Sequence, residues 1–379
     1  MAKSQSETLE KILIHLCATG VAENVFPGCV AGVSIGRGVH RVRATGQAGK
    51  LSRGSQKLDV TSDSYYDLAS LTKPLCTAGC IVKLIEQGCI DWNTPLADYF
   101  NALKTGDDKE RITVGHLVSH SAGFRAYTPY FKRFSSIFAE HNKRTLLHNI
   151  LNEELEYKPG EKNIYSDWGY ILLGELIKRI TTMELDTFFN QTITKPLGLT
   201  EHLFFLPLEN RHKPIPPLNI APTEQCDWRN TVMQSQVHDE HCYLLGGVAG
   251  HAGLFGNIYG VLFLCEHILD SWVEKRTSLS GIPFYQLFNH YTAHSNWYLG
   301  FDTPTIGNST SGQYFSPNSA GHLGFTGTSL WMDPEKEIIV VLLSNRINPT
   351  RENEKIRQFR PFFHDSIMEK IQKNPPPVR

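Results

Sequence analysis

A serine and a lysine lie three residues apart in the segment Asp67-Leu-Ala-Ser70-Leu-Thr-Lys73-Pro74, ahead of an apolar stretch typical of a helix. Residues three apart share one helix face, so the Lys73 amine can reach the Ser70 hydroxyl. A serine hydroxyl becomes a nucleophile when a neighbouring base takes its proton. Proline is tolerated in the first helical turn, so Pro74 predicts that Ser70 lies at the helix start, where free N–H groups favour an oxyanion. We expect burial and this positive helix end to lower the pKa of Lys73, although an ordinary surface pair is the alternative.

A second motif, Tyr165-Ser166-Asp167, follows a Pro159-Gly160 turn and precedes an apolar run at helical spacing that begins at Trp168. This placement predicts a loop tyrosine directed into a cleft. A phenol beside a lysine ammonium is shifted towards phenolate, so Tyr165 can serve as general base or acid. The alternative is a tyrosine at the edge of the core with Asp167 as the N-cap of the next helix. The two readings are compatible.

A third motif, His322-Leu-Gly324-Phe325, begins a predicted strand that a polar turn connects to the apolar strand 338–345. This pattern predicts a hairpin in the core sheet. Gly324 would let a ligand lie against the strand, and the Phe325 N–H would join that of Ser70 in an oxyanion hole. A similar motif, His251-Ala-Gly253, leads into a helix-like run without a partner strand, so we assign it no role.

Together the three motifs resemble the serine β-lactamase and penicillin-binding-protein superfamily, on its class C side, over roughly residues 25 to 347. The segment 112–124, Ile-Thr-Val-Gly-His-Leu-Val-Ser-His-Ser-Ala-Gly-Phe, is similar to a structural signature of that family. The resemblance implies that Ser70 is the acyl-accepting nucleophile and that Lys73 and Tyr165 form the proton-transfer pair. It also implies that residues 322–325 form the wall of the substrate site.

Two residues depart from the class C pattern, which has lysine where this chain has His322 and asparagine where it has Asp167. In the family that lysine helps to hold a substrate carboxylate, and histidine, with an ordinary pKa of about 6.5, does so less firmly. Ionised Asp167 only accepts hydrogen bonds, which suits a substrate N–H or ammonium. Both departures count against a true β-lactamase. The variants look closest to a subgroup linked to peptidoglycan turnover, whose members are described as muropeptide amidases or D,D-carboxypeptidase-like.

The motifs thus predict a serine hydrolase that forms an acyl-enzyme on Ser70 and cleaves an amide or peptide bond in peptidoglycan-derived fragments. A small-molecule esterase on the same fold is one alternative, and a penicillin-binding receptor or β-lactamase is another. We expect no cofactor and no metal. Among the sixteen histidines, neither the pair His116 and His120 nor the pair His238 and His241 matches the His-Glu-x-x-His zinc pattern.

The elements around the motifs predict an α/β fold of the α+β sandwich type, with an antiparallel sheet flanked by helices and an all-α insertion. Segments 28–36 and 39–45 form a predicted hairpin, residues 68–200 are mainly helical, and 206–242 form a long loop with five prolines. We expect one domain over 1–372, its sheet part at about 1–67 and 243–372, its helical part at about 68–242, and a disordered tail at 373–379. The site would lie in the crevice between the two parts.

Composition restricts the partners of this 379-residue chain. Its 37 basic and 38 acidic residues nearly cancel, which argues against nucleic acid. The N-terminal segment predicts an amphipathic helix without the apolar core of a signal peptide, and no apolar run approaches the ~20 residues of a membrane span. Its eight cysteines follow no disulfide framework. We therefore expect a cytoplasmic protein, not inserted in a membrane, whose partner is a small-molecule or muropeptide substrate; its oligomeric state is open.

Overall fold

The computed structural model describes residues 2–53, 58–136, 138–210, 219–292, 295 and 297–373. Its centre is an antiparallel sheet in the order β2-β1-β10-β9-β8, which joins strands from both ends of the chain. The antiparallel sheet with flanking helices that the sequence predicts is confirmed. The strands of this sheet are β1 (Gly28–Ile35), β2 (Val42–Gly49), β8 (Ala320–Leu323), β9 (Ser329–Asp333) and β10 (Ile338–Ser344).

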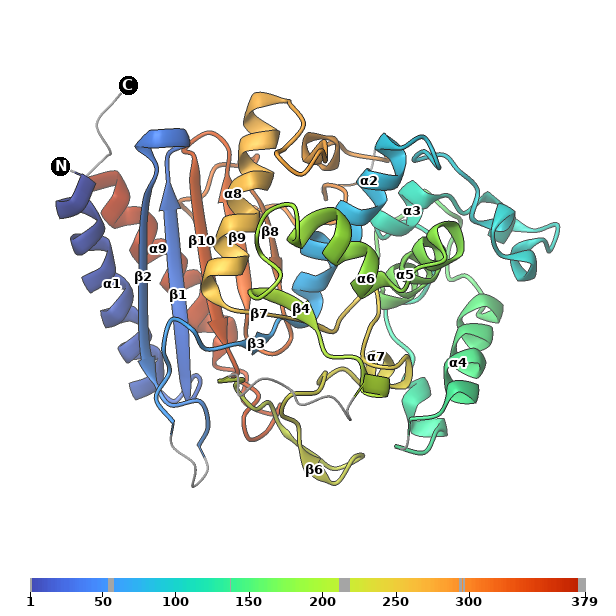
Figure 1. Ribbon diagram of the computed structural model, residues 1–379, viewed down its shortest axis with the longest axis horizontal. Helices are drawn as coiled ribbons and strands as arrows, with labels where there is room; N and C mark the ends of the chain where they lie inside the picture. The colour runs from blue at the N-terminus through green and yellow to red at the C-terminus, as the bar shows by residue number, and fades with distance from the viewer. Residues whose placement is uncertain are drawn as a thin grey trace.

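Helices cover both faces of the sheet (Figure 1). The helices α1 (Ala2–Ala22) and α9 (Ile356–Lys373) pack on one face, and α8 (Ile258–Glu274) packs on the other. Every residue of β1 and β10 is consequently buried. Because helices cover both faces, both strands consist of nearly continuous apolar residues, without the alternation of a strand that has one face in water. The predicted N-terminal helix is confirmed as α1. The predicted first hairpin is confirmed as well, because β1 and β2 pair in antiparallel register.

The remaining helices lie mainly beyond α8, on the side away from α1 and α9 (Figure 1). They are α2 (Gly79–Glu86), α3 (Val114–Val118), α4 (Glu140–Asn152), α5 (Asp167–Thr181), α6 (Leu185–Phe189) and α7 (Glu240–Leu244). Two small sheets accompany them. One joins β3 (Tyr66–Asp67), β7 (Leu254–Gly256) and β4 (Leu203–Phe205), and the other joins β5 (Gln225–Cys226) and β6 (Thr231–Val232).

The structure corrects the predicted elements at three places. The strand expected to begin at His322 is two strands, because a turn closed by the Gly324 N–H and the Thr328 carbonyl, 2.8 Å apart, separates β8 from β9. The run after His251 has partner strands after all, since β7 pairs with β3 and β4. The helix after Ser70 starts as a 3-10 turn, Ala69–Leu71, and continues as a π-helix, Lys73–Ala78, that contains Pro74. Proline lacks the N–H of a regular α-helical ladder, which favours such an irregular start.

Two further expectations concern the chain ends and membranes. Lys373 is the last residue of α9, and the rest of the expected disordered tail, 374–379, lies outside the described residues. Within the described ranges, no helix has both the length and the apolar character needed to cross a membrane.

One buried ion pair fastens α8 to the sheet. The Glu266 carboxylate of α8 accepts hydrogen bonds from the Ser34 hydroxyl of β1 and from the Arg43 guanidinium of β2, each at 2.7 Å. Arg41 lies 3.3 Å from the same carboxylate, and both of these side chains are almost fully buried. Removing the Glu266 charge would leave the buried Arg41 with Asp270, 2.6 Å away, as its remaining partner, and breaking a buried pair is strongly destabilising.

We therefore expect Glu266→Gln to lower the free energy of unfolding by about 3 kcal/mol. Urea denaturation followed by circular dichroism measures this change. Glu354→Gln is the matched control, because Glu354 pairs with Arg357 at the surface and should contribute little. If both variants unfolded at the same urea concentration, the Glu266 ion pair would not contribute to stability as expected.

Candidate functional site

The predicted site residues meet in one cleft of about 1100 Å³. Ser70, Tyr165, Asp167 and residues 322, 324 and 325 all line this cleft. Lys73 lies beneath its floor, with a fully buried side chain. The structure therefore brings together residues that are up to 255 positions apart in the sequence.

The turn that carries Ser70 is strained and firmly held. Ala69, just before the candidate nucleophile, has a φ of +48°, a left-handed conformation that alanine rarely adopts. The buried Asp67 carboxylate accepts the Ala69 N–H at 2.9 Å and the His238 N–H at 2.7 Å. The Asp67 carbonyl accepts the hydroxyl of Thr326, next to the wall strand, at 2.7 Å. Such strain persists only where surrounding contacts fix it, and it is common at active sites.

Lys73 contacts three separate segments. Its Nζ lies 3.0 Å from Ser70 Oγ, 3.1 Å from the His251 carbonyl oxygen and 2.7 Å from Asp167 Oδ1. Burial by itself lowers the pKa of Lys73, but the Asp167 carboxylate and the hydrogen bonds to Asp167 and Tyr165 outweigh burial and raise this pKa above its ordinary value. The expectation of a lowered pKa is therefore wrong, because the sequence did not place a carboxylate against the ammonium.

Tyr165 is also protonated at rest. Burial is the main cause that raises the pKa of Tyr165, whereas the Lys73 charge lowers it and Asp167 raises it again. The Lys73 ammonium lies 4.8 Å from the centre of the Tyr165 ring. The expected shift of the Tyr165 pKa towards phenolate fails because burial of the phenol, together with the Asp167 charge, outweighs the effect of Lys73.

The start of α5 explains why Asp167 is available to Lys73. The N-cap of α5 is Ser166, whose hydroxyl oxygen accepts the Trp168 N–H at 3.4 Å. Asp167, suggested by the sequence as the cap, is instead the first helical residue. Its carboxylate is thus free to pair with the ammonium of Lys73.

The wall residues differ from expectation in charge and in the role of glycine. Burial and the nearby Lys73 lower the pKa of His322 to about 3, so this imidazole is neutral and does not hold a carboxylate by charge. A Cβ at Gly324 would collide with the Thr328 hydroxyl and the Leu68 carbonyl. Close packing of the turn against the Ser70 segment therefore requires this glycine, whatever ligand lies in the cleft.

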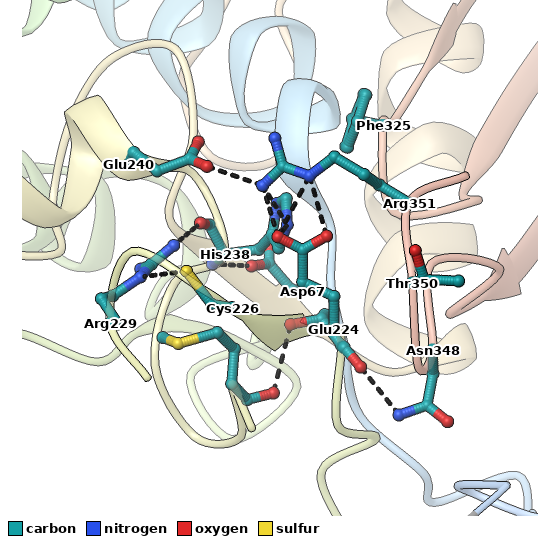
Figure 2. A network of polar contacts seen from close by, with 12 residues as sticks. Asp67, Glu224, Cys226, Arg229, His238, Glu240, Phe325, Asn348, Thr350 and Arg351 are labelled. Carbon is teal, nitrogen blue, oxygen red and sulfur yellow. Dashed lines mark hydrogen bonds and ion pairs between the residues drawn. The ribbon is translucent and has the colours of Figure 1, made fainter. Parts of the chain in front are cut away.

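Phe325, which lines the cleft, lies against a polar network around Arg351 and His238 (Figure 2). The Phe325 ring stacks on the His238 ring at 5.6 Å, and the Arg351 guanidinium lies 5.7 Å from its centre. Arg351 in turn pairs with Glu224 and Glu240. Within the ranges that the structure describes, the backbone N–H groups of Ser70 and Phe325 have no hydrogen-bond acceptor. Both remain available for the oxyanion hole that the sequence predicts.

Three side chains of the cleft region, at positions 120, 239 and 251, were missed as site residues. His251 is fully buried, its carbonyl accepts from Lys73, and its Nε2 lies 2.8 Å from the cleft carboxylate Asp239. His120 lies against Tyr165, with ring centres 4.5 Å apart. The repeated His-x-Gly pattern and the Ser-His-Ser-Ala-Gly sequence were the available signals for His251 and His120.

These residues include one possible cation site. Ligand atoms of Asp167, Asp239 and His251 lie within 4.8 Å of one another. Lys73 already supplies a cation 2.7 Å from Asp167. A metal ion bound there would therefore compete with the lysine that contacts Ser70.

Known proteins match both the sequence and the fold. A family model described as Beta-lactamase matches residues 13–361. A protein of Salmonella enteritidis PT4 (strain P125109), named "Putative D-alanyl-D-alanine carboxypeptidase", is 34% identical over 325 residues, which are 78% of this chain and 72% of that protein. The solved octameric penicillin-binding protein homologue from Pyrococcus abyssi has a TM-score of 0.66 at 20% identity, covering 89% of this chain and 73% of its own. The solved structure of the hydrolase EstCE1, with promiscuous acyltransferase activity, has a TM-score of 0.69 at 18% identity, covering 94% of this chain and 99% of its own. The two solved structures share the fold.

The ion pair predicts how acylation depends on pH. Asp167 raises the pKa of both Lys73 and Tyr165, so it keeps a proton on whichever group must accept one from Ser70. In Asp167→Asn, the rise of the acylation rate with pH should therefore begin at lower pH than in the parent. The measurement is the second-order rate of acylation by p-nitrophenyl acetate from pH 5.5 to 10.

Glu352→Gln is the control, because it removes the same charge from the cleft lining. Its profile should coincide with that of the parent. An Asp167→Asn profile that also coincides, or that moves to higher pH, would show that the ion pair does not govern proton transfer.

Proposed function

Because the chain belongs to the beta-lactamase family and is a serine hydrolase, we propose that it cleaves amide or peptide bonds in peptidoglycan-derived fragments through an acyl-enzyme on Ser70. The contact that carries the proposal is the 3.0 Å approach of the buried Lys73 amine to the Ser70 hydroxyl beside Tyr165. The name of the Salmonella relative supports the substrate class. The action would be that of an amidase or a D,D-carboxypeptidase.

Proton transfer is the first step of the proposed reaction. Lys73 rests as an ammonium paired with Asp167, so it must lose its proton before it can accept one from Ser70. Because the Asp167 carboxylate raises the pKa of Lys73, the fraction of free amine, and with it the rate of acylation, rises with pH. Asparagine, which the class C pattern has in the place of Asp167, carries no charge that would hold this proton on Lys73.

Acyl transfer then follows on Ser70. The Ser70 Oγ forms a bond to the substrate carbonyl carbon, and its proton passes through Tyr165 to Lys73. The N–H groups of Ser70 and Phe325 stabilise the oxyanion. As the C–N bond breaks, the network returns the proton to the leaving amine. A water molecule then attacks the ester carbonyl carbon and gives one proton to the network. As the bond from the acyl carbon to Ser70 Oγ breaks, the acid leaves and the network passes this proton to Ser70 Oγ.

The charges of the cleft favour a peptide fragment with free ends. Arg346, Arg357 and Arg360 line the cleft, and so do Asp239 and Glu240. Muropeptide fragments carry both ammonium and carboxylate groups, which such a lining can bind. Because His322 is neutral, the three arginines are the groups that would bind a substrate carboxylate in its place.

A small-molecule esterase is the second candidate. The neutral His322 favours it, because the wall strand then offers no cation to an anionic substrate. The fold likeness to EstCE1 is compatible with it.

A matched set of peptides separates the two candidates. A peptide that ends in D-Ala-D-Ala with free ends should release D-Ala at least about 10-fold faster than the same peptide with an amidated C-terminus releases D-alaninamide, because a charge-assisted hydrogen bond contributes about 1.5–3 kcal/mol. Ser70→Ala should lose roughly 10⁴-fold or more in rate. Mass spectrometry of the products gives both values. Turnover of neutral esters with none of either peptide would favour the esterase.

Reactivity towards β-lactams should be low and should respond to the wall charge. With neutral His322, the parent should show no faster acylation by a chromogenic cephalosporin at pH 5.5 than at pH 8. Asp167→Asn with His322→Lys restores the class C residues and should raise this acylation about 10- to 100-fold. Asp167→Asn alone is the control. If the double variant were acylated no faster than Asp167→Asn alone, the charge at position 322 would not determine reactivity towards β-lactams.

A further inference from the structure

Tyr165 lies in the loop before α5, yet its phenol must stay beside Ser70 and Lys73 to transfer protons. Loop residues lack the ladder of hydrogen bonds that fixes helices and strands. Some other contact must therefore hold the ring. Among the described residues, His120 contacts Tyr165 and both of its chain neighbours.

His120 holds the loop by three contacts. Its carbonyl oxygen accepts the Ile164 N–H at 3.0 Å, and its ring Nδ1 accepts the Ser166 N–H at 3.2 Å. Between these two bonds, its ring lies against the Tyr165 ring, with centres 4.5 Å apart and planes 33° apart. His120 thus holds the backbone on both sides of Tyr165 and lies nearer to its ring than Trp297 or His322, whose ring centres are 6.0 and 5.9 Å away.

The backbone of His120 is strained to make these contacts. Its φ is +55°, in the left-handed region, and the side chain is buried. The Tyr157 hydroxyl donates to the same carbonyl at 3.3 Å. Residues in such conformations persist only where their surroundings fix them, and they cluster at functional sites.

The contact with Ser166 also fixes the protonation of the ring. A nitrogen that accepts a backbone N–H cannot carry a proton, so the hydrogen of neutral His120 is on Nε2. Burial and the charge of the nearby Lys73 lower the pKa of His120 well below its ordinary value. The imidazole therefore remains neutral, and its bond to Ser166 persists across the working pH range.

We propose that His120 is the positioning residue of Tyr165, holding the phenol against Ser70 and Lys73 for proton transfer. This inference rests on the acyl-enzyme chemistry proposed above, and it is independent of which substrate supplies the acyl group. It also explains why position 120 is a histidine. The positive φ by itself could be met by glycine or asparagine, but neither has a ring to pack against Tyr165.

The test variant is His120→Asn. Asparagine tolerates positive φ, and its side-chain oxygen can replace Nδ1 as the acceptor for Ser166, so the variant removes mainly the ring against Tyr165. The rate of Ser70 acylation by p-nitrophenyl acetate should fall roughly 10- to 100-fold, as expected for a displaced catalytic group. His116→Asn is the matched control, because His116 caps α3 through Nδ1 and does not line the cleft. Its rate should match that of the parent.

A double-mutant cycle separates positioning from general damage. Tyr165→Phe lacks the phenol, so adding His120→Asn to it should change the residual acylation rate by less than about twofold. The same loss in both backgrounds, or no loss in the parent background, would overturn the proposal. If His120→Asn does not fold, His120→Gly, which also accepts positive φ, gives the same cycle.

The reagent keeps this test apart from the substrate question. p-Nitrophenyl acetate acylates an activated serine whatever its natural substrate is. The double-mutant cycle therefore still tests the role of His120 even if the protein does not cleave muropeptides. Failure of the parent to become acylated on Ser70 would instead contradict the proposed mechanism itself.

Discussion

A buried ammonium group organises the site. Lys73 is out of contact with water, and a charge in that position is tolerated only when it is paired and hydrogen-bonded. Its partners come from the Ser70 turn, the start of α5 and the His251 segment, which are distant in sequence. The need to satisfy one charge therefore brings three segments together, and the same contacts set the proton affinities on which the proposed chemistry depends.

Backbone strain occurs beside both proposed reactive side chains. Ala69 precedes Ser70, His120 lies against Tyr165, and both have positive φ. Asp67 ties the first strained residue to His238, and the network around Arg351 continues to Phe325. The nucleophile turn and the wall strand thus share one set of buried polar contacts (Figure 2), which keeps their N–H groups in a fixed relation.

The sequence predicted the antiparallel sheet, its first hairpin and the three motifs that meet in the cleft, because local patterns carry that information. It mispredicted the pKa direction of Lys73, since spacing does not show that Asp167 lies 2.7 Å from the amine. His322 was expected to be partly charged because its burial beside Lys73 is a tertiary property. Asp239 belongs to no pattern that points to the site, and the His-x-Gly repeat at His251 does not show that this histidine lies beside Lys73 and Asp239.

The order of the sheet has a consequence for synthesis. β1 lies between β2 and β10, and Ile35 pairs with Ile338, roughly 300 residues later. A ribosome adds about 5–20 residues per second, so a nascent β1–β2 hairpin keeps one apolar edge unpaired for about 15–60 seconds. β8 and β9 directly precede β10 in the sequence, so the ribosome synthesises them in the same late part of the chain. Chains that stop before this point leave that edge open to pairing with other chains, so the nascent protein depends on protection from aggregation until translation is nearly complete.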